Sequence, residues 1–247
     1  GGKRYAWGVL LGALTINLIT VHSFWPVAAV TLGNTLEALC GAWLLTRYGR
    51  FNPTIQSLRD YLRLIILGGG VGVGIGAVAG STVLLVFGVL GSEAYFHYLL
   101  QWWAGDVLGV ILITPLILVG RQTRKEWFDV KWLSEAVLLL SLTFLAGQVV
   151  FLDWLHDSIV EAAKAYWMFA FVAWAAVRLG VRGTVVVLTM TAVQALLGAY
   201  WGTGFFADDI AITHLANYWF FMVILSVVGM ALATYLAERK QVEEALR

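Results

Sequence analysis

An uncharged stretch of 29 residues, 64–92, sets the first limit on what the chain can fold into. It exceeds the roughly 20 apolar residues that cross a bilayer as a helix. Glycines recur in it at every fourth position, at Gly68, Gly72, Gly76 and Gly80. This spacing places them on one helix face, where small residues let a neighbouring helix approach closely. The stretch is therefore predicted to be a transmembrane helix with a glycine-lined packing face.

The same stretch contains a pattern found in dinucleotide-binding loops. Gly74-x-Gly76-x-x-Ala79 fits the glycine fingerprint, and Glu93 lies roughly where a ribose-binding acid would follow. A cofactor loop, however, should follow a strand and open an amphipathic helix. Because an uncharged run surrounds this pattern on both sides, we interpret it as part of the membrane helix and predict no cofactor.

The composition extends this interpretation to the whole chain. Hydrophobic residues make up 60% of the 247 residues, charged residues 13%, and the mean hydropathy is +0.82. These values leave too little polar surface for a soluble protein of this length. We predict an all-α, polytopic transmembrane helix bundle of about eight spans. The predicted spans cover residues 5–21, 27–46, 62–90, 99–120, 133–152, 166–178, 183–201 and 217–237.

The loops between these spans differ strongly in charge. With eight spans, fifteen of the 16 Lys and Arg residues fall on one side of the membrane and only Lys164 on the other. The positive-inside rule then predicts that both ends of the chain are cytoplasmic. The outer loops hold acidic residues, Asp208 and Asp209 among them. They also hold all four histidines, which are His22, His97, His156 and His214.

No catalytic or metal-binding pattern is found in the sequence. The histidines lie on separate loops without the i, i+3 or i, i+4 spacing of a metal-binding helix, so no metal site is predicted. No nucleophile elbow, P-loop or H-E-x-x-H motif occurs. We expect that this chain performs no chemistry itself and that its surroundings are the lipid bilayer, with no nucleic-acid partner.

Polar residues within two predicted spans are candidates for ligand binding or signalling. Asn34 and Glu37 share a face of the second span, and Gln101, Trp102 and Asp106 lie in the fourth. Both spans run inward, so at 1.5 Å per residue Glu37 lies roughly 15 Å and Asp106 roughly 10 Å below the outer boundary. The two acids could therefore face one cavity. The alternative is a purely structural role, such as a hydrogen bond from Glu37 to Gln148 or Gln194.

Two further residues of the fourth span are candidates. Trp103 is expected either in the interfacial aromatic belt or, together with Trp102, as a roof over a binding cavity. Pro115 lies inside the predicted span, where it should kink the helix.

Three blocks of sequence resemble successive parts of the MASE1 family. They are "GNTLEALCGAWLLTR" (33–47), "WWAGDVLGVILITPLIL" (102–118) and "AWAAVRLGVRGTVVVL" (173–188). The resemblance implies a membrane-embedded sensory domain of bacterial inner-membrane signalling proteins. In that family the domain precedes an output domain such as a diguanylate cyclase, a cyclic-di-GMP phosphodiesterase or a histidine kinase. It also implies residues 1–237 as the sensory domain, 238–247 as the start of a cytoplasmic signalling helix, and a homodimer.

Two other interpretations stay open. Acids within the spans, a proline inside the fourth span and short spans near 166–201 are also typical of a small-molecule or ion transporter. The other is a membrane anchor that binds a partner membrane protein. Compared with the family, the chain is expected to lack an N-terminal hairpin, since residues 1–4 resemble the basic loop that follows it. We also expect an output domain after residue 247.

Overall fold

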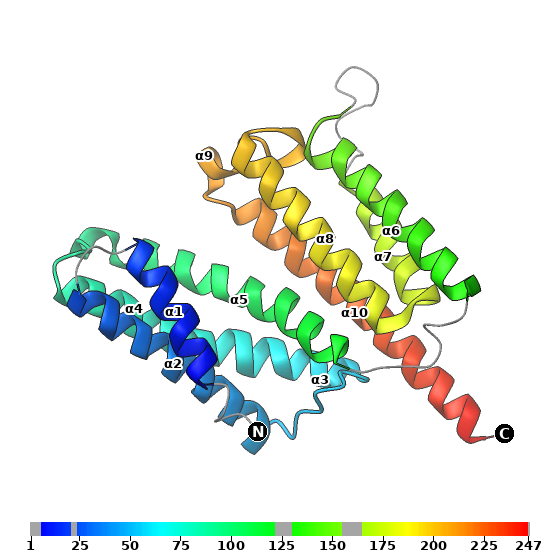
Figure 1. Ribbon diagram of the computed structural model, residues 1–247, viewed down its shortest axis with the longest axis horizontal. Coiled ribbons are helices and arrows are strands. Elements are labelled where there is room, and N and C mark those ends of the chain that lie inside the picture. Colours follow the sequence, from blue (N-terminus) through cyan, green and yellow to red (C-terminus); the bar gives the residue numbers. More distant parts are fainter. Residues whose placement is uncertain (1–5, 21–23, 122–129, 155–164, 247) are drawn as a thin grey trace. The chain divides into compact units, whose positions relative to one another are not determined.

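A computed structural model describes residues 6–20, 24–121, 130–154 and 165–246, and every regular element in these ranges is helical (Figure 1). The all-α prediction is confirmed. The α-helices are α1 (Ala6–Thr20), α2 (Phe24–Arg47), α3 (Leu58–Arg63), α4 (Val73–Val86), α5 (Tyr95–Gly120), α6 (Val130–Phe151), α7 (Trp167–Arg178), α8 (Gly180–Trp201), α9 (Asp209–Thr213) and α10 (Ala216–Ala245). A π-helix, η2 (Leu64–Gly72), joins α3 to α4, and η3 (Ser92–Ala94) and η6 (Gly204–Phe206) are short 3₁₀ turns.

Six helical segments are long and apolar enough to cross a membrane. They are Phe24–Arg47, Leu58–Val86, Ser92–Gly120, Trp132–Phe151, Gly180–Trp201 and Ala216–Glu244. The remaining two predicted spans coincide with shorter apolar helices, Ala6–Ile19 and Trp167–Arg178. All eight predicted segments are thus helical, while the crossing of the membrane by all eight stays a prediction.

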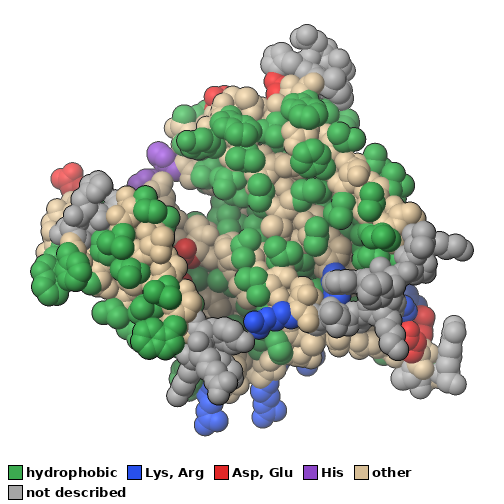
Figure 2. Space-filling model, viewed as in Figure 1, with side chains coloured by type: hydrophobic (Ala, Val, Ile, Leu, Met, Phe, Trp, Pro, Cys, Tyr) green, Lys and Arg blue, Asp and Glu red, His purple; other side chains and the backbone are tan. Residues whose placement is uncertain are grey.

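The surface of the described helices suits a membrane environment. Figure 2 shows hydrophobic side chains spread over the visible face of the molecule. Large apolar side chains such as Ile19, Val86 and Phe220 are more than half exposed. A soluble protein would bury most such side chains, so we attribute their exposure to contact with lipid.

The chain forms two compact units, which we call unit 1 (1–51 and 62–110) and unit 2 (52–61 and 111–247). In unit 1, α2 packs against α1, η2 and α4. Buried Asn17 of α1 donates from Nδ2 to Thr31 Oγ1 of α2 at 3.1 Å. In unit 2, α8 packs against α6, α7 and α10.

Residues 58–86 form one uninterrupted helical segment with a π-helical middle. The π turn covers Leu64–Gly72 and includes three consecutive glycines, 68–70. Glycine stabilises an α-helix less than any residue except proline, so this is where the regular geometry is most easily lost. The sequence predicted the helix but not its change of pitch. π segments occur frequently at functional sites.

Unit 2 is held by close contacts around the end of α6. Phe151 is fully buried, and its ring stacks on Phe206 with centroids 5.9 Å apart. Its carbonyl oxygen lies directly against the Cα positions of Gly198 and Gly204, where a Cβ atom would overlap it. Thr203 Oγ1 donates to the same carbonyl at 3.4 Å. Only glycine fits at these two contacts.

The first turn of α10 is capped by a buried carboxylate. Asp209, 5% exposed, accepts hydrogen bonds from the backbone N–H of Tyr218 and from the Asn217 amide, both at 2.9 Å, and from the Thr213 hydroxyl. A carboxylate at this position satisfies free N–H groups and favours the positive end of the helix dipole. From this cap α10 continues without a break to Ala245.

Candidate functional site

The candidate site lies in unit 1, where side chains of α2 and α5 meet the glycine face of α4. The Glu37 side chain of α2 occupies the space beside Gly76, so that a Cβ atom at Gly76 would overlap its carboxylate. Glu37 itself is half-buried. The glycine at 76 therefore makes room for an acidic side chain within a candidate membrane span.

Two residues of α5 complete this site. The ring of Trp102 lies against Gly80 in the same manner, and its indole approaches the carboxylate of Asp106. Asp106 is half-buried and close enough to Glu37 for their charges to interact. That the two acids face one cavity stays a prediction. We call these two residues the acidic pair.

The four glycines of the predicted packing face lie in three kinds of surroundings. Only Gly72 makes the expected close helix contact, since a Cβ atom there would lie 3.1 Å from the Gly41 Cα of α2. Gly76 and Gly80 instead face the side chains of the site. At Gly68 an added Cβ would meet its neighbours at 3.5 Å, an ordinary van der Waals distance. The face thus serves mainly to accommodate side chains.

Trp103 connects α5 to the helical segment 58–86. Its Nε1 donates to the carbonyl oxygen of Gly70 at 3.2 Å, inside the π-helix η2. The side chain is half-buried, and its place in an interfacial belt or above a binding cavity stays a prediction. Trp103 therefore ties α5 to the irregular part of the neighbouring helix, next to the acidic pair.

Three other predicted candidates lie outside the acidic pair's contacts. Gln101 is exposed on α5. Asn34, one turn from Glu37, is half-buried with an unpartnered Oδ1. Pro115 is buried within the part of α5 that belongs to unit 2, and the predicted kink there remains untested. Of the alternative partners for Glu37, Gln194 donates instead to the Phe144 carbonyl at 2.9 Å.

No metal-binding cluster of three or more His, Cys, Asp and Glu side chains occurs within the described ranges. His97 and His214 are exposed on separate elements. His22 and His156 lie outside the described residues. The site is thus composed of two carboxyl groups, an indole and glycines. Two carboxylates so close together repel each other, and a proton or a bound cation between them would relieve the repulsion.

Sequence reasoning missed the segment 52–61, which connects helices of unit 1 but belongs to unit 2. Ile55 and Tyr61 are both fully buried there. The Tyr61 hydroxyl approaches that of Ser226 on α10, although neither completes a hydrogen bond. Ile55 has φ +48°, a strained conformation for a β-branched residue. A glycine at position 55 would have signalled such a turn, and the isoleucine does not.

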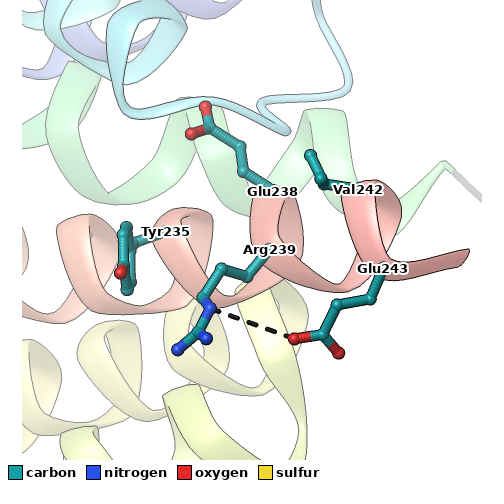
Figure 3. Close-up of a pocket in the computed structure, with 5 residues that line it drawn as sticks. All are labelled: Tyr235, Glu238, Arg239, Val242 and Glu243. Carbon is teal, nitrogen blue, oxygen red and sulfur yellow. Dashed lines mark ion pairs between the residues drawn. The ribbon is translucent and has the colours of Figure 1, made fainter. Parts of the chain in front are cut away.

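The last turns of α10 carry a polar surface. Tyr235, Glu238, Arg239, Val242 and Glu243 surround a shallow hollow of about 380 Å³ (Figure 3). The Arg239 guanidinium points toward Glu243, with Nε and Oε1 4.0 Å apart. On the opposite side, Gln241 Nε2 donates to Gln56 Oε1 at 3.3 Å, which links this end of α10 to the segment 52–61.

Comparison with known proteins gives one match. The model of the MASE1 family matches residues 2–240, nearly the whole chain. No curated protein sequence and no solved structure matches it.

Proposed function

The chain belongs to the MASE1 family, the membrane-associated sensory domains of signalling proteins, and from this membership we propose that it is the sensory input domain of a bacterial signal-transduction receptor. In this proposal it crosses the inner membrane eight times with both ends in the cytoplasm. It performs no catalysis itself. A cytoplasmic output domain, of the diguanylate cyclase, cyclic-di-GMP phosphodiesterase or histidine kinase type, follows α10 in the full-length protein, which acts as a homodimer.

The observation that carries the proposal is the length and continuity of α10. Its 30 residues run from the Asp209 cap through a candidate membrane span to the polar surface around Arg239. No glycine or proline follows Gly229. A continuous helix can transmit a rotation or an axial shift along its length, whereas a glycine or proline break would absorb it.

The helical segment 58–86 gives a route from the acidic pair to α10. Gly76 and Gly80 of this segment contact Glu37 and Trp102, and its first residues, up to Tyr61, belong to the unit that contains α10. The π-helix lies between the two. Because a π turn can be gained or lost with a shift of one residue, it offers a way to move Tyr61 relative to Ser226.

An insertion series after Glu238 tests the proposed signalling path. One inserted residue rotates the downstream part of the helix by about 100° and moves it by about 1.5 Å, whereas seven nearly restore its original orientation about the helix axis. In a full-length receptor we expect that one inserted residue makes the output independent of the signal. Seven inserted residues should recover most of the regulation. Output is measured as cyclic-di-GMP level or kinase phosphorylation, according to the domain present.

A matched series after Arg50, which precedes the segment 52–61, controls for insertion into the chain as such. It should show no seven-residue periodicity, because Arg50 lies in the loop after α2 rather than in a helix. A flat response to the series after Glu238, with the protein still folded, would remove α10 as the signalling path. The transporter interpretation predicts that flat response.

A further inference from the structure

A groove in unit 2 combines apolar walls with two glutamine amides. It has a volume of about 390 Å³, and its walls come mainly from α6 and α8. Apolar side chains such as Phe144, Met190 and Val193 line it, together with Gln148 and Gln194. This volume lies within the range of small-molecule binding sites, which are typically apolar with a few polar groups.

Gln194 has a structural role at this groove. It is 4% exposed, and its Nε2 donates to the Phe144 carbonyl. Its Oε1 lies against Gly147, where a Cβ atom would overlap it, and makes no hydrogen bond. Gln194 therefore fixes α8 against α6, and Gly147 covers its free oxygen.

Gln148 is different because its side-chain amide remains available. The residue is 6% exposed and lines the groove, and the structure gives its side chain no hydrogen bond to a described residue. Its backbone carbonyl is already occupied by the N–H groups of Leu152 and Trp154. An unpaired amide among apolar side chains is unfavourable, and more so where no water is at hand. A molecule bound in the groove can supply a partner for it.

We propose that this groove binds a membrane-soluble molecule with an apolar body and a carbonyl group, whose oxygen accepts a hydrogen bond from Gln148 Nε2. Both α6 and α8 contain candidate membrane spans, so apolar molecules dissolved in the bilayer can reach the groove. Val193 is 53% exposed at its edge, and Met190 is a flexible side chain that adapts to irregular ligands. Membranes supply such carbonyls from isoprenoid quinones and from the ester groups of lipids.

The experiment measures binding to the purified chain in detergent, with two probes in separate arms. Decyl-benzoquinone represents the quinone source and dioctanoyl phosphatidylglycerol the lipid source. Binding is followed as the rise in thermal midpoint with probe concentration. We expect saturable binding of at least one probe, and the arm that responds identifies the source of the carbonyl.

Two variants test the groove, each with a matched control. Gln148→Leu should weaken binding about threefold to tenfold, the usual effect of losing one hydrogen bond. Without probe it should raise the thermal midpoint, because an unpaired buried amide is removed. Gln101→Leu makes the same chemical change on an exposed residue of α5 and should leave binding unchanged.

Val193→Trp should fill the groove and abolish binding. Leu138→Trp, on a side chain that is 52% exposed and lies away from the groove, should have no effect. The proposal is wrong if neither probe binds saturably, or if binding survives both Gln148→Leu and Val193→Trp. This inference goes beyond the proposed sensory function, and since no output domain is needed, its failure would leave that function untouched.

Discussion

The two units use glycine in contrasting ways. In unit 1, Gly76 and Gly80 make room for the side chains of Glu37 and Trp102, whereas in unit 2 Gly198 and Gly204 make room for the backbone carbonyl of Phe151. A side chain can rotate away from an added atom, but a carbonyl at the end of a packed helix cannot. The span in α8 is also 61% buried, against 28% for the span in α2. The comparison indicates a rigid unit 2 that contains α10 and an adjustable unit 1 that holds the acidic pair.

The largest loss of stability is expected in the rigid unit 2. Gly204→Ala adds a Cβ atom where the backbone of Phe151 already lies, at a residue with φ +68°. Left-handed strain and overpacking together should lower the free energy of unfolding by roughly 2–5 kcal/mol. Thermal unfolding in detergent measures it.

Gly202→Ala separates the two causes. Gly202 has nearly the same backbone angle, φ +66°, but the nearest atom to an added Cβ, the Ala207 carbonyl oxygen, would lie 3.9 Å away. Only the conformational strain, about 1–2 kcal/mol, should remain. If the two variants lose equal stability, the Phe151 carbonyl is not the rigid obstacle described above.

A smaller effect is expected in unit 1, where the obstacle is a side chain. Gly76→Ala should displace Glu37 and lower the free energy of unfolding by roughly 1–2 kcal/mol. Gly68→Ala, with neighbours at 3.5 Å, should stay within about 0.5 kcal/mol of the wild type. The difference between these two positions tests whether the glycine face accommodates side chains or simply lines a helix contact.

The double variant Gly76→Ala with Glu37→Ala should recover much of the loss, because it removes the overlapping carboxylate. A coupling of about 1 kcal/mol in this double-mutant cycle would support the contact. Additive losses would show that Glu37 does not fill the space beside Gly76.

The sequence predicted the parts of this protein that depend on hydropathy and helical spacing. Eight apolar segments are helical, and Glu37 and Asp106, which we compared by their expected depth in two spans, interact through their charges. It could not predict which glycine faces a side chain and which faces backbone, since that depends on the rotation of each helix. Asp209 was expected among the acids of an outer loop, but the structure buries it as a helix cap. Nothing in the local pattern distinguishes a capping aspartate from a solvated one.

A small effect on stability is also expected from changes to the acidic pair itself. Glu37→Gln and Asp106→Asn keep the size and shape of each side chain and retain an oxygen that can accept a hydrogen bond, for Asp106 also from the nearby Trp102 indole. Each variant should therefore unfold within about 0.5–1 kcal/mol of the wild type, because packing against Gly76 and Gly80 is preserved. The change should appear in signalling instead. Removing one of the two carboxylates removes the repulsion that a bound proton or cation would otherwise relieve. Output of the full-length receptor, compared with thermal unfolding of the same variants, separates the two effects. Glu93→Gln, on an exposed acid before α5, is the control and should change neither. If the two amide variants unfold the protein while Gly76→Ala does not, then the carboxyl groups hold unit 1 together and the adjustable element must be sought elsewhere.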